Sequence, residues 1–232
     1  MGIVKEERIG DCRLIQGDCL QILPSLGAQD SIVTDPPYGM GFRSNHREKK
    51  HGVIVMDKDA FAMQWAASLG VKHSKYIWMR WDNLAALPKP TSLVTWVKNN
   101  HSMGDLEHEH GRQTEVCAFY RGPDHFFPSG RPTDVIRAPR TGNELHPTQK
   151  PLGLMQAVVE WTSGAVADPF MGSGTTLVAC AKLGRKGIGI EIDPDYFDIA
   201  CKRVEEAYRQ RDLFVPAPDE IKPEQLDMLG DD

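Results

Sequence analysis

The sequence lacks several features that would assign a protein to a class. Its 232 residues contain no run of about 18 or more apolar residues, and the charged start MGIVKEERIG has no apolar signal-peptide core. We therefore expect a cytoplasmic protein without a membrane span. The five cysteines are scattered and form no CxxC pair, so neither disulfides nor a metal site is expected.

The chain also lacks a net positive charge, which argues against long-range attraction to nucleic acid. The net charge is −5, yet residues 216–232 carry six acids and one lysine and account for all of it. We expect this segment to be a flexible acidic tail. The remaining body is neutral and contains two basic stretches, 43–51 and 131–140, that are candidates for phosphate contact.

A double proline ends a short apolar segment at residues 30–39, which read DSIVTDPPYG. The apolar part predicts a buried strand, and Pro36 and Pro37 end it because neither has an N–H for a sheet ladder. Asp35 and Tyr38 are then presented at the carboxyl end of a strand, where open α/β sheets place their sites. This combination suits a flat molecule with an NH2 edge. A plain strand end followed by a turn would fit the same residues.

A glycine-rich loop occurs far along the chain, in GAVADPFMGSGTTLVACAKLGRKGIGIEID at residues 164–193. The pattern predicts a strand at 165–167, a turn at 170–174, a helix at 175–183 and a strand at 187–192. Such an order is typical of a nucleoside-binding unit, in which a later acid binds the ribose hydroxyls. A P-loop would need a lysine after Gly174, and a dinucleotide fingerprint would need a third glycine. A nucleoside without a pyrophosphate remains, with S-adenosylmethionine as the candidate.

The DPPY and DPFMGSGTT motifs, together with HPTQKP at 146–151, resemble those of the amino-methylating DNA methyltransferases. The order resembles the permuted group, in which the DPPY half precedes the cofactor half, and the resemblance covers most of residues 11–210. It implies S-adenosylmethionine as cofactor, double-stranded DNA as partner, base flipping and a role in DNA methylation and restriction-modification. A homodimer and a partner nuclease are left open.

The resemblance also implies roles for individual residues. Those matching the catalytic motif are Asp35, Pro36, Pro37 and Tyr38. Asp18 matches the acid on the adenine side of the cofactor, and Thr148 and Lys150 match the segment near its methionine end. The other cofactor-binding residues lie in or after the glycine loop: Asp168, Phe170, Gly172, Gly174, Thr175, Glu191 and Asp193.

The identity of the target base depends on the first residue of the catalytic motif. The family tends to carry serine there for cytosine, so Asp35 favours the amino group of adenine. Asp35 and the Pro36 carbonyl would accept the two N–H groups, and Tyr38 would stack on the flipped base. Methylation of cytosine N4 and a catalytically inactive DNA-binding subunit are the alternatives.

Alternating strand and helix signals predict a Rossmann-like α/β fold, with a mostly parallel sheet covered by helices on both faces. Besides the elements of the glycine-loop half, we expect strands at 12–16, 31–34, 76–79, 93–97 and 116–120, and helices at 19–26, 60–69, 152–163 and 194–211. Residues 1–215 are expected to form one methyltransferase domain. Two long irregular stretches are expected to act on DNA: a flap at 39–56 and a target-recognition insertion within 98–145. The histidines of the second stretch lack metal-site spacing.

Overall fold

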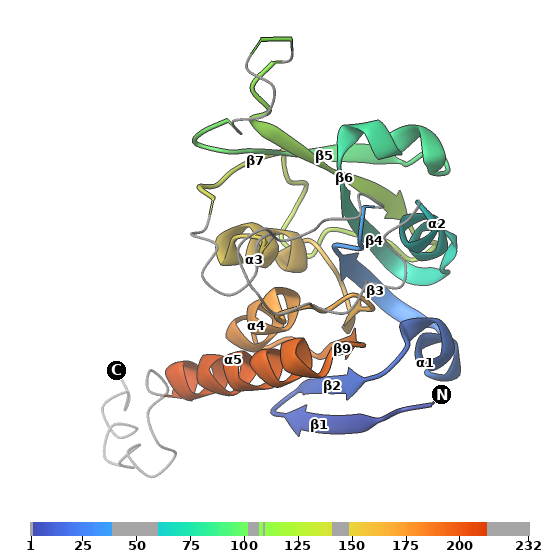
Figure 1. Cartoon of the computed structure of the whole chain (residues 1–232), viewed down its shortest axis with the longest axis vertical. Coiled ribbons are helices and arrows are strands. Elements are labelled where there is room, and N and C mark those ends of the chain that lie inside the picture. The colour runs from blue at the N-terminus through green and yellow to red at the C-terminus, as the bar shows by residue number, and fades with distance from the viewer. Residues whose placement is uncertain (1, 39–59, 102–106, 109, 141–148, 213–232) are drawn as a thin grey trace, which may run out of the picture.

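The computed structural model describes residues 2–38, 60–101, 107–108, 110–140 and 149–212 (Figure 1). Strands alternate with helices through most of this range, as the sequence predicts. The strands are β1 (Lys5–Ile9), β2 (Cys12–Gln16), β3 (Gln29–Thr34), β4 (Val71–Met79), β5 (Ser92–Val97), β6 (Thr114–Arg121), β7 (Val135–Arg137), β8 (Val166–Asp168) and β9 (Gly187–Glu191). The helices are α1 (Cys19–Ser25), α2 (Phe61–Ser68), the 3-10 helix η1 (Trp81–Ala86), α3 (Leu152–Glu160), α4 (Thr175–Lys182) and α5 (Pro194–Asp212).

All the described strands join one sheet in the order β1-β2-β9-β8-β3-β4-β6-β5-β7. Strands β2, β9, β8, β3 and β4 run parallel to one another, and β5 is parallel to β7. Strand β1 pairs antiparallel with β2. Strand β6 runs antiparallel between β4 and β5. Its first residues therefore lie at the edge of the sheet where β3, β4 and β5 end. The mostly parallel α/β sheet confirms the predicted fold class.

Helices cover both faces of the sheet because alternate residues of a strand point in opposite directions. On β3, Val33 packs in the cluster that contains α3, α4 and α5, whereas Ile32 packs with α1. On β4, Tyr76 belongs to the first of these clusters, and Ile77 packs with α2 on the other face. Figure 1 shows this division, with α1 and α2 on one side of the sheet and α3, α4 and α5 on the other.

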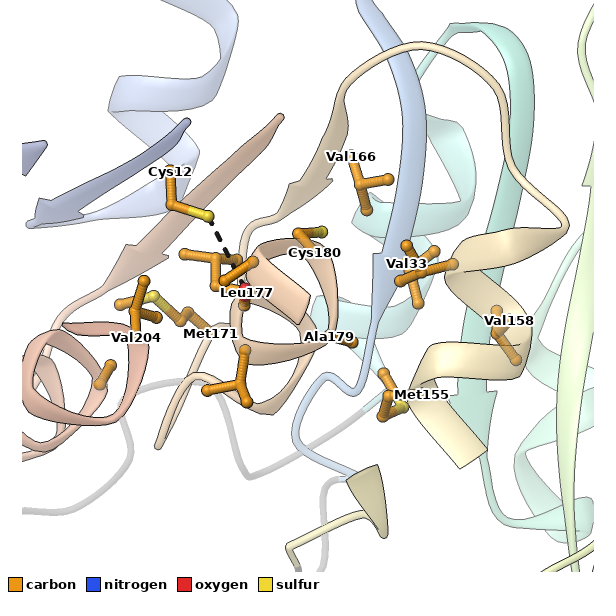
Figure 2. Packing of buried hydrophobic residues seen from close by; sticks show 14 of the residues in the cluster. Cys12, Val33, Met155, Val158, Val166, Met171, Leu177, Ala179, Cys180 and Val204 are labelled. Carbon is orange, nitrogen blue, oxygen red and sulfur yellow. Dashed lines mark hydrogen bonds between the residues drawn. The ribbon is translucent and has the colours of Figure 1, made fainter. Parts of the chain in front are cut away.

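Helix α4 is the most deeply buried helix of the described chain, and it begins at the glycine loop. Figure 2 shows it between α3, which contributes Met155 and Val158, and α5, which contributes Val204. Leu177 lies beneath the strands, where its carbonyl accepts a weak bond from the Cys12 thiol at 3.7 Å. This packing fixes the first turn of α4 relative to the sheet.

The strands and helices predicted from sequence are all present, with ends that differ by a few residues. Strand β1, strand β7 and η1 were not predicted. The flap at 39–56 and the acidic tail at 216–232 lie outside the described residues. The stretch 98–145 contains β6 and β7, which are part of the sheet itself. Among the described residues, no helix is both long and apolar enough to cross a membrane.

Candidate active site

The DPPY motif lies at the carboxyl end of β3, between the ends of β8 and β4. Thr34 is the last strand residue, and the chain leaves the sheet at Asp35, as the two prolines predict. Pro36 is buried, whereas Asp35 and Tyr38 are partly exposed. The motif therefore combines a fixed backbone with two functional side chains at an accessible edge of the sheet.

Asp35, Tyr38 and Lys150 form one hydrogen-bonded group of side chains, the candidate catalytic cluster. The Lys150 ammonium donates to Asp35 Oδ2 at 2.7 Å and to the Tyr38 hydroxyl at 3.0 Å. The Tyr38 hydroxyl in turn donates to Asp35 Oδ1 at 2.5 Å. Sequence reasoning assigned Lys150 to the methionine end of the cofactor, which remains a prediction. The structure adds that its ammonium group lies against the catalytic motif, 115 residues earlier in the chain.

Opposite charges keep Lys150 and the neighbouring Glu115 ionised, whereas Tyr38 stays neutral. Burial disfavours the charged form of Lys150, but the carboxylates of Asp35 and Glu115 outweigh it, so its pKa lies well above the usual value. Burial raises the pKa of Glu115, yet Lys150 and Lys98 lower it below its usual value. Burial and the Asp35 charge raise the pKa of Tyr38, so its phenol remains a hydrogen-bond donor.

The glycine loop follows β8 and precedes α4. Gly174 has a φ of +82°, and an added Cβ would lie 2.9 Å from the Cβ of Ala200 on α5, so glycine is required there. Gly172 also has a positive φ, of +54°, but an added Cβ would meet nothing within 4 Å. The backbone at Gly172 therefore faces open space, whereas Gly174 lets the loop pack against α5.

Glu191, at the end of β9, holds the loop by its backbone. Its Oε2 accepts the N–H of Gly172 at 2.7 Å, and its Oε1 accepts the N–H of Asp193 at 2.9 Å. Burial raises the pKa of Glu191, while these two amides oppose the change. Asp193 has a separate role, since its Oδ1 accepts from Asp195 and Tyr196 and caps the start of α5.

Asp168 connects β3, the strand that precedes the DPPY motif, with the glycine loop. Its Oδ1 accepts from the Thr34 hydroxyl at 2.7 Å and from the Phe170 N–H at 3.1 Å, and its Oδ2 accepts from the Thr176 hydroxyl at 2.6 Å. Burial raises its pKa to about 6, against these three hydrogen bonds. Thr175, at the start of α4, accepts a 3.3 Å bond from Arg203 instead.

Two further predicted residues lie beside the loop. Asp18 caps α1 through the Leu20 N–H, at 2.9 Å, and the neighbouring Gly17 N–H binds the Glu191 carbonyl at 2.8 Å. Phe170 packs edge-on against Trp65 of α2, with ring centroids 5.9 Å apart. This contact shows that Phe170 contributes to the packing between the loop and α2. Thr148 lies outside the described residues.

Sequence reasoning did not identify several groups that contact these residues. Glu115 and Lys98 extend the catalytic cluster, with Glu115 Oε2 lying 3.2 Å from the Lys150 ammonium. Arg203 of α5 binds the carbonyl and hydroxyl oxygens of Ser173 in the glycine loop, at 2.5 and 2.9 Å. None of these residues belongs to a local motif. Glu115 alone could have been noticed, because it directly precedes the strand predicted at 116–120. Within the described part of the chain, no three histidine, cysteine or acidic residues are arranged to hold a metal ion.

Comparison with known proteins agrees with this geometry. The family model described as DNA methylase matches residues 133–202. The Escherichia coli (strain K12) protein named "Putative methylase YubD" is 30% identical over 234 residues, which cover 91% of this chain and 98% of that protein. A relative of this identity and coverage shows the family and not only a shared segment.

Two solved structures show the same fold. The M1.HpyAVI–SAM complex has a TM-score of 0.60 and 24% identity, covering 83% of this chain and 99% of that one. The cytosine-N4-specific PvuII DNA methyltransferase has a TM-score of 0.65 and 14% identity, covering 90% and 96%. The family model, the full-length relative and the fold agree: the chain belongs to the DNA methylase family of N6 and N4 amino-methyltransferases.

Proposed function

We propose that this protein transfers the methyl group of S-adenosylmethionine to the exocyclic amino group of adenine in double-stranded DNA. The observation that carries the proposal is the position of Asp35, which presents a carboxylate at the carboxyl end of β3 beside the glycine loop. Thr34 and Asp168 join these two regions through a hydrogen bond of 2.7 Å. A group bound by the loop and a base bound at Asp35 would therefore be neighbours.

The loop residues fit the cofactor. Open space over Gly172 allows close approach to the backbone, and Glu191 supplies a partly buried carboxylate for ribose hydroxyls. Both oxygens of Glu191 already accept one amide N–H each, but a carboxylate oxygen has a second lone pair. Glu191 can therefore bind a hydroxyl while it holds the loop. Asp18 lies at the end of β2, where it would face the adenine side.

The cofactor supplies an electrophilic methyl group on a positively charged sulfur. The chain must localise the lone pair of an aromatic amino nitrogen, which is otherwise delocalised into the ring. Asp35 accepts one N–H of the target and the Pro36 carbonyl accepts the other, which aims the lone pair at the methyl group. Lys150 and Tyr38 each donate to one oxygen of Asp35, and each oxygen keeps a further lone pair for the target N–H. Positioning of this kind contributes on the order of 7 to 11 kcal/mol in favourable cases.

Aspartate at position 35 supports adenine as the target, because the family tends to carry serine there for cytosine. Cytosine N4 is the second candidate, since a protein of the same fold is named as cytosine-N4-specific. Either base must leave the helix stack to reach a site at the sheet edge. Tyr38 would stack on the flipped base, with its hydroxyl anchored by Asp35 and Lys150.

DNA contact is supported by exposed arginines near the same edge. Arg131, Arg137 and Arg140 are exposed on and around the edge strand β7, and the Arg140 N–H binds Asn99 just after β5. These residues would contact phosphates, which supply most of the sequence-independent affinity. Because β6 and β7 are sheet strands, we place base reading in the connections at 98–113 and 122–134 within the proposed recognition stretch.

One experiment tests the base, the site and the activity together. DNA from a methylation-deficient host that expresses the protein is sequenced by a method that maps N6-methyladenine and N4-methylcytosine. N6-methyladenine at a defined sequence supports the proposal. N4-methylcytosine instead would show that cytosine, the second candidate, is the target base. Expression of Asp35→Ala provides the control. Unmodified DNA from a host that contains folded wild-type protein would favour an inactive DNA-binding subunit and contradict the proposal.

A further inference from the structure

The catalytic cluster continues beyond Lys150 into the hairpin of β5 and β6. Lys98 follows β5 directly, and Glu115 is the second residue of β6, paired with Trp96 in the antiparallel register. Glu115 Oε1 accepts a 2.5 Å hydrogen bond from the Lys98 ammonium, while Oε2 lies 3.2 Å from the Lys150 ammonium. Each glutamate oxygen thus faces a different lysine, and Lys150 connects the glutamate with Asp35.

The burial of these groups makes their pairing necessary. The side chains of Lys98 and Lys150 are only 8% and 6% exposed, and those of Glu115 and Asp35 are 22% and 23% exposed. A buried ion is costly unless an opposite charge and hydrogen bonds compensate it. Two ammonium groups and two carboxylates balance here. Removal of one leaves a net charge on the buried cluster, so the position of each group depends on its neighbours.

Another buried lysine shows that the fold does not need carboxylates to bury an ammonium group. Lys75 on β4 is 4% exposed, and its ammonium donates to the carbonyls of Ala67 and Leu69 near the end of α2. Burial lowers the pKa of Lys75 to about 8, because no carboxylate among the described residues opposes it. Lys150 is also buried, but its ammonium lies against two carboxylates. The pairing with Glu115 is therefore specific to the catalytic edge.

We propose that Glu115, held by Lys98, is a positioning residue that fixes the place and charge of Lys150 and so orients Asp35 toward the target amino group. Glu115 itself does not contact the base. Its effect passes through Lys150, whose ammonium holds Asp35 Oδ2 at 2.7 Å. The inference rests on the proposed function in one respect, namely that Asp35 is the acceptor of the amino group.

The proposal has a consequence for pH. The groups that face Lys150 are Asp35, the Tyr38 hydroxyl, Glu115 and the neutral thiol of Cys117, with the Trp78 ring beside them. Burial lowers the pKa of Lys150, and the two carboxylates raise it. Loss of the Glu115 charge removes one of the raising contributions. The pKa of Lys150 then falls, so during an alkaline titration Lys150 loses its proton at a lower pH than in the wild type.

Glu115→Gln tests this directly because it removes the charge and keeps the shape. We expect kcat to fall about 100-fold, as for a small misplacement of a reacting group, with little change in cofactor affinity. The remaining activity should decline at alkaline pH where wild-type activity does not. Glu115→Asp retains the charge and should restore the alkaline limb of the profile. A wild-type rate and profile in folded Glu115→Gln would overturn the proposal.

A double-variant comparison separates positioning from general stability. Lys98→Met should lower kcat by roughly tenfold, and adding it to Glu115→Gln should cause no further loss, since Lys98 acts through Glu115. Additive losses would show an independent role and contradict the assignment. Lys75→Met is the matched control: it removes another buried ammonium of the sheet, and the alkaline limb should stay as in the wild type.

A readout without catalysis keeps this inference distinct from the proposed function. The side-chain ammonium signal of Lys150 is followed by NMR during a pH titration of the wild-type, Glu115→Gln and Lys75→Met proteins. A lower midpoint in Glu115→Gln alone supports the proposal even if the wild type methylates nothing, in which case only the proposed function fails. An unchanged midpoint overturns the proposal whether or not the wild type is active.

Discussion

The catalytic cluster and the glycine loop lie on one edge of the sheet, but they are built by different interactions. The cluster depends on charged side chains, with Lys150 between Asp35 and Glu115. The loop depends on backbone amides and hydroxyl groups, as in the bond from the Gly172 N–H to Glu191. This difference supports two separate proposed roles: the cluster would orient the target amino group, and the loop would bind the cofactor through its shape and its backbone. Substitutions in one region should therefore change turnover, and substitutions in the other should change binding.

The largest expected effect is that of Asp35→Ala. Methyl transfer should fall by about 1000-fold or more, equivalent to roughly 4 kcal/mol of activation free energy, because the acceptor of the amino group is lost. Lys150 retains Glu115 as a partner, so the fold should persist. Transfer of a radiolabelled methyl group to duplex DNA measures the rate, and calorimetry measures cofactor affinity.

Asp198→Ala is the control for this prediction, since Asp198 is an exposed acid paired with Lys5 on the far strand β1. Its activity should match that of the wild type. An equal loss of cofactor affinity and activity in Asp35→Ala would contradict the proposed separation of roles, because Asp35 would then be part of the cofactor site.

The second prediction concerns Asp168, which joins the two regions. Its pKa is raised by burial from 3.8 to about 6, so the native state binds more protons than the unfolded state between these values. The stability contribution of Asp168 is therefore highest at low pH and falls by about 1.4 kcal/mol per unit as the pH rises toward 6, then stays constant. Denaturant unfolding at several pH values, compared with Asp168→Asn, isolates this contribution. A difference between the two proteins that does not change with pH would refute the assignment.

The third prediction concerns Glu191. Glu191→Ala should weaken S-adenosylmethionine binding by roughly 1.5 to 3 kcal/mol, the size of hydrogen bonds to a charged group. Because the Gly172 and Asp193 amides also lose their acceptor, the loop itself should loosen. Calorimetry gives the affinity, and the single-turnover rate at saturating cofactor should change much less. Unchanged affinity in a folded variant would exclude Glu191 from the cofactor site.

The smallest expected effects distinguish two glycines of the loop. Gly174→Ala should destabilise the protein by roughly 1 to 3 kcal/mol, because the new Cβ meets Ala200 and φ is positive. Gly172→Ala has space for its Cβ and should cost about 1 kcal/mol for its φ, but it should weaken cofactor binding more than Gly174→Ala does. Thermal unfolding and calorimetry on both variants measure the contrast. Equal effects on both quantities would mean that the loop does not face the ligand at Gly172.

The same contrast explains what could be predicted from the sequence. The glycine loop, the acid at the end of β9 and the strand before the double proline were predictable because their partners are near in sequence or repeat a known spacing. Glu191, for example, binds an amide 19 residues away. The catalytic cluster assembles from residues 35, 98, 115 and 150, whose proximity depends on strand order in the sheet. No periodicity or motif specifies that β6 runs backward between β4 and β5 and places Glu115 beside Lys150.

Edge elements were missed for a related reason. Strand β1 reads KEERI, and its charged residues hide its pairing with β2. Strand β7 has only three residues, too few for an alternating pattern. Both form at the margins of a sheet that the central strands have already organised, and their own composition gives little indication of it.

The hydrogen bonds of Asp168 to Thr34 and Thr176 have a consequence for the energetics of alignment. They make the spacing between the methyl donor and its acceptor a property of the folded chain, set before either molecule arrives. Much of the entropy that two free reactants would lose on alignment is then lost when the protein folds. A protein with both binding regions but without these hydrogen bonds could bind each molecule well and still transfer the methyl group slowly.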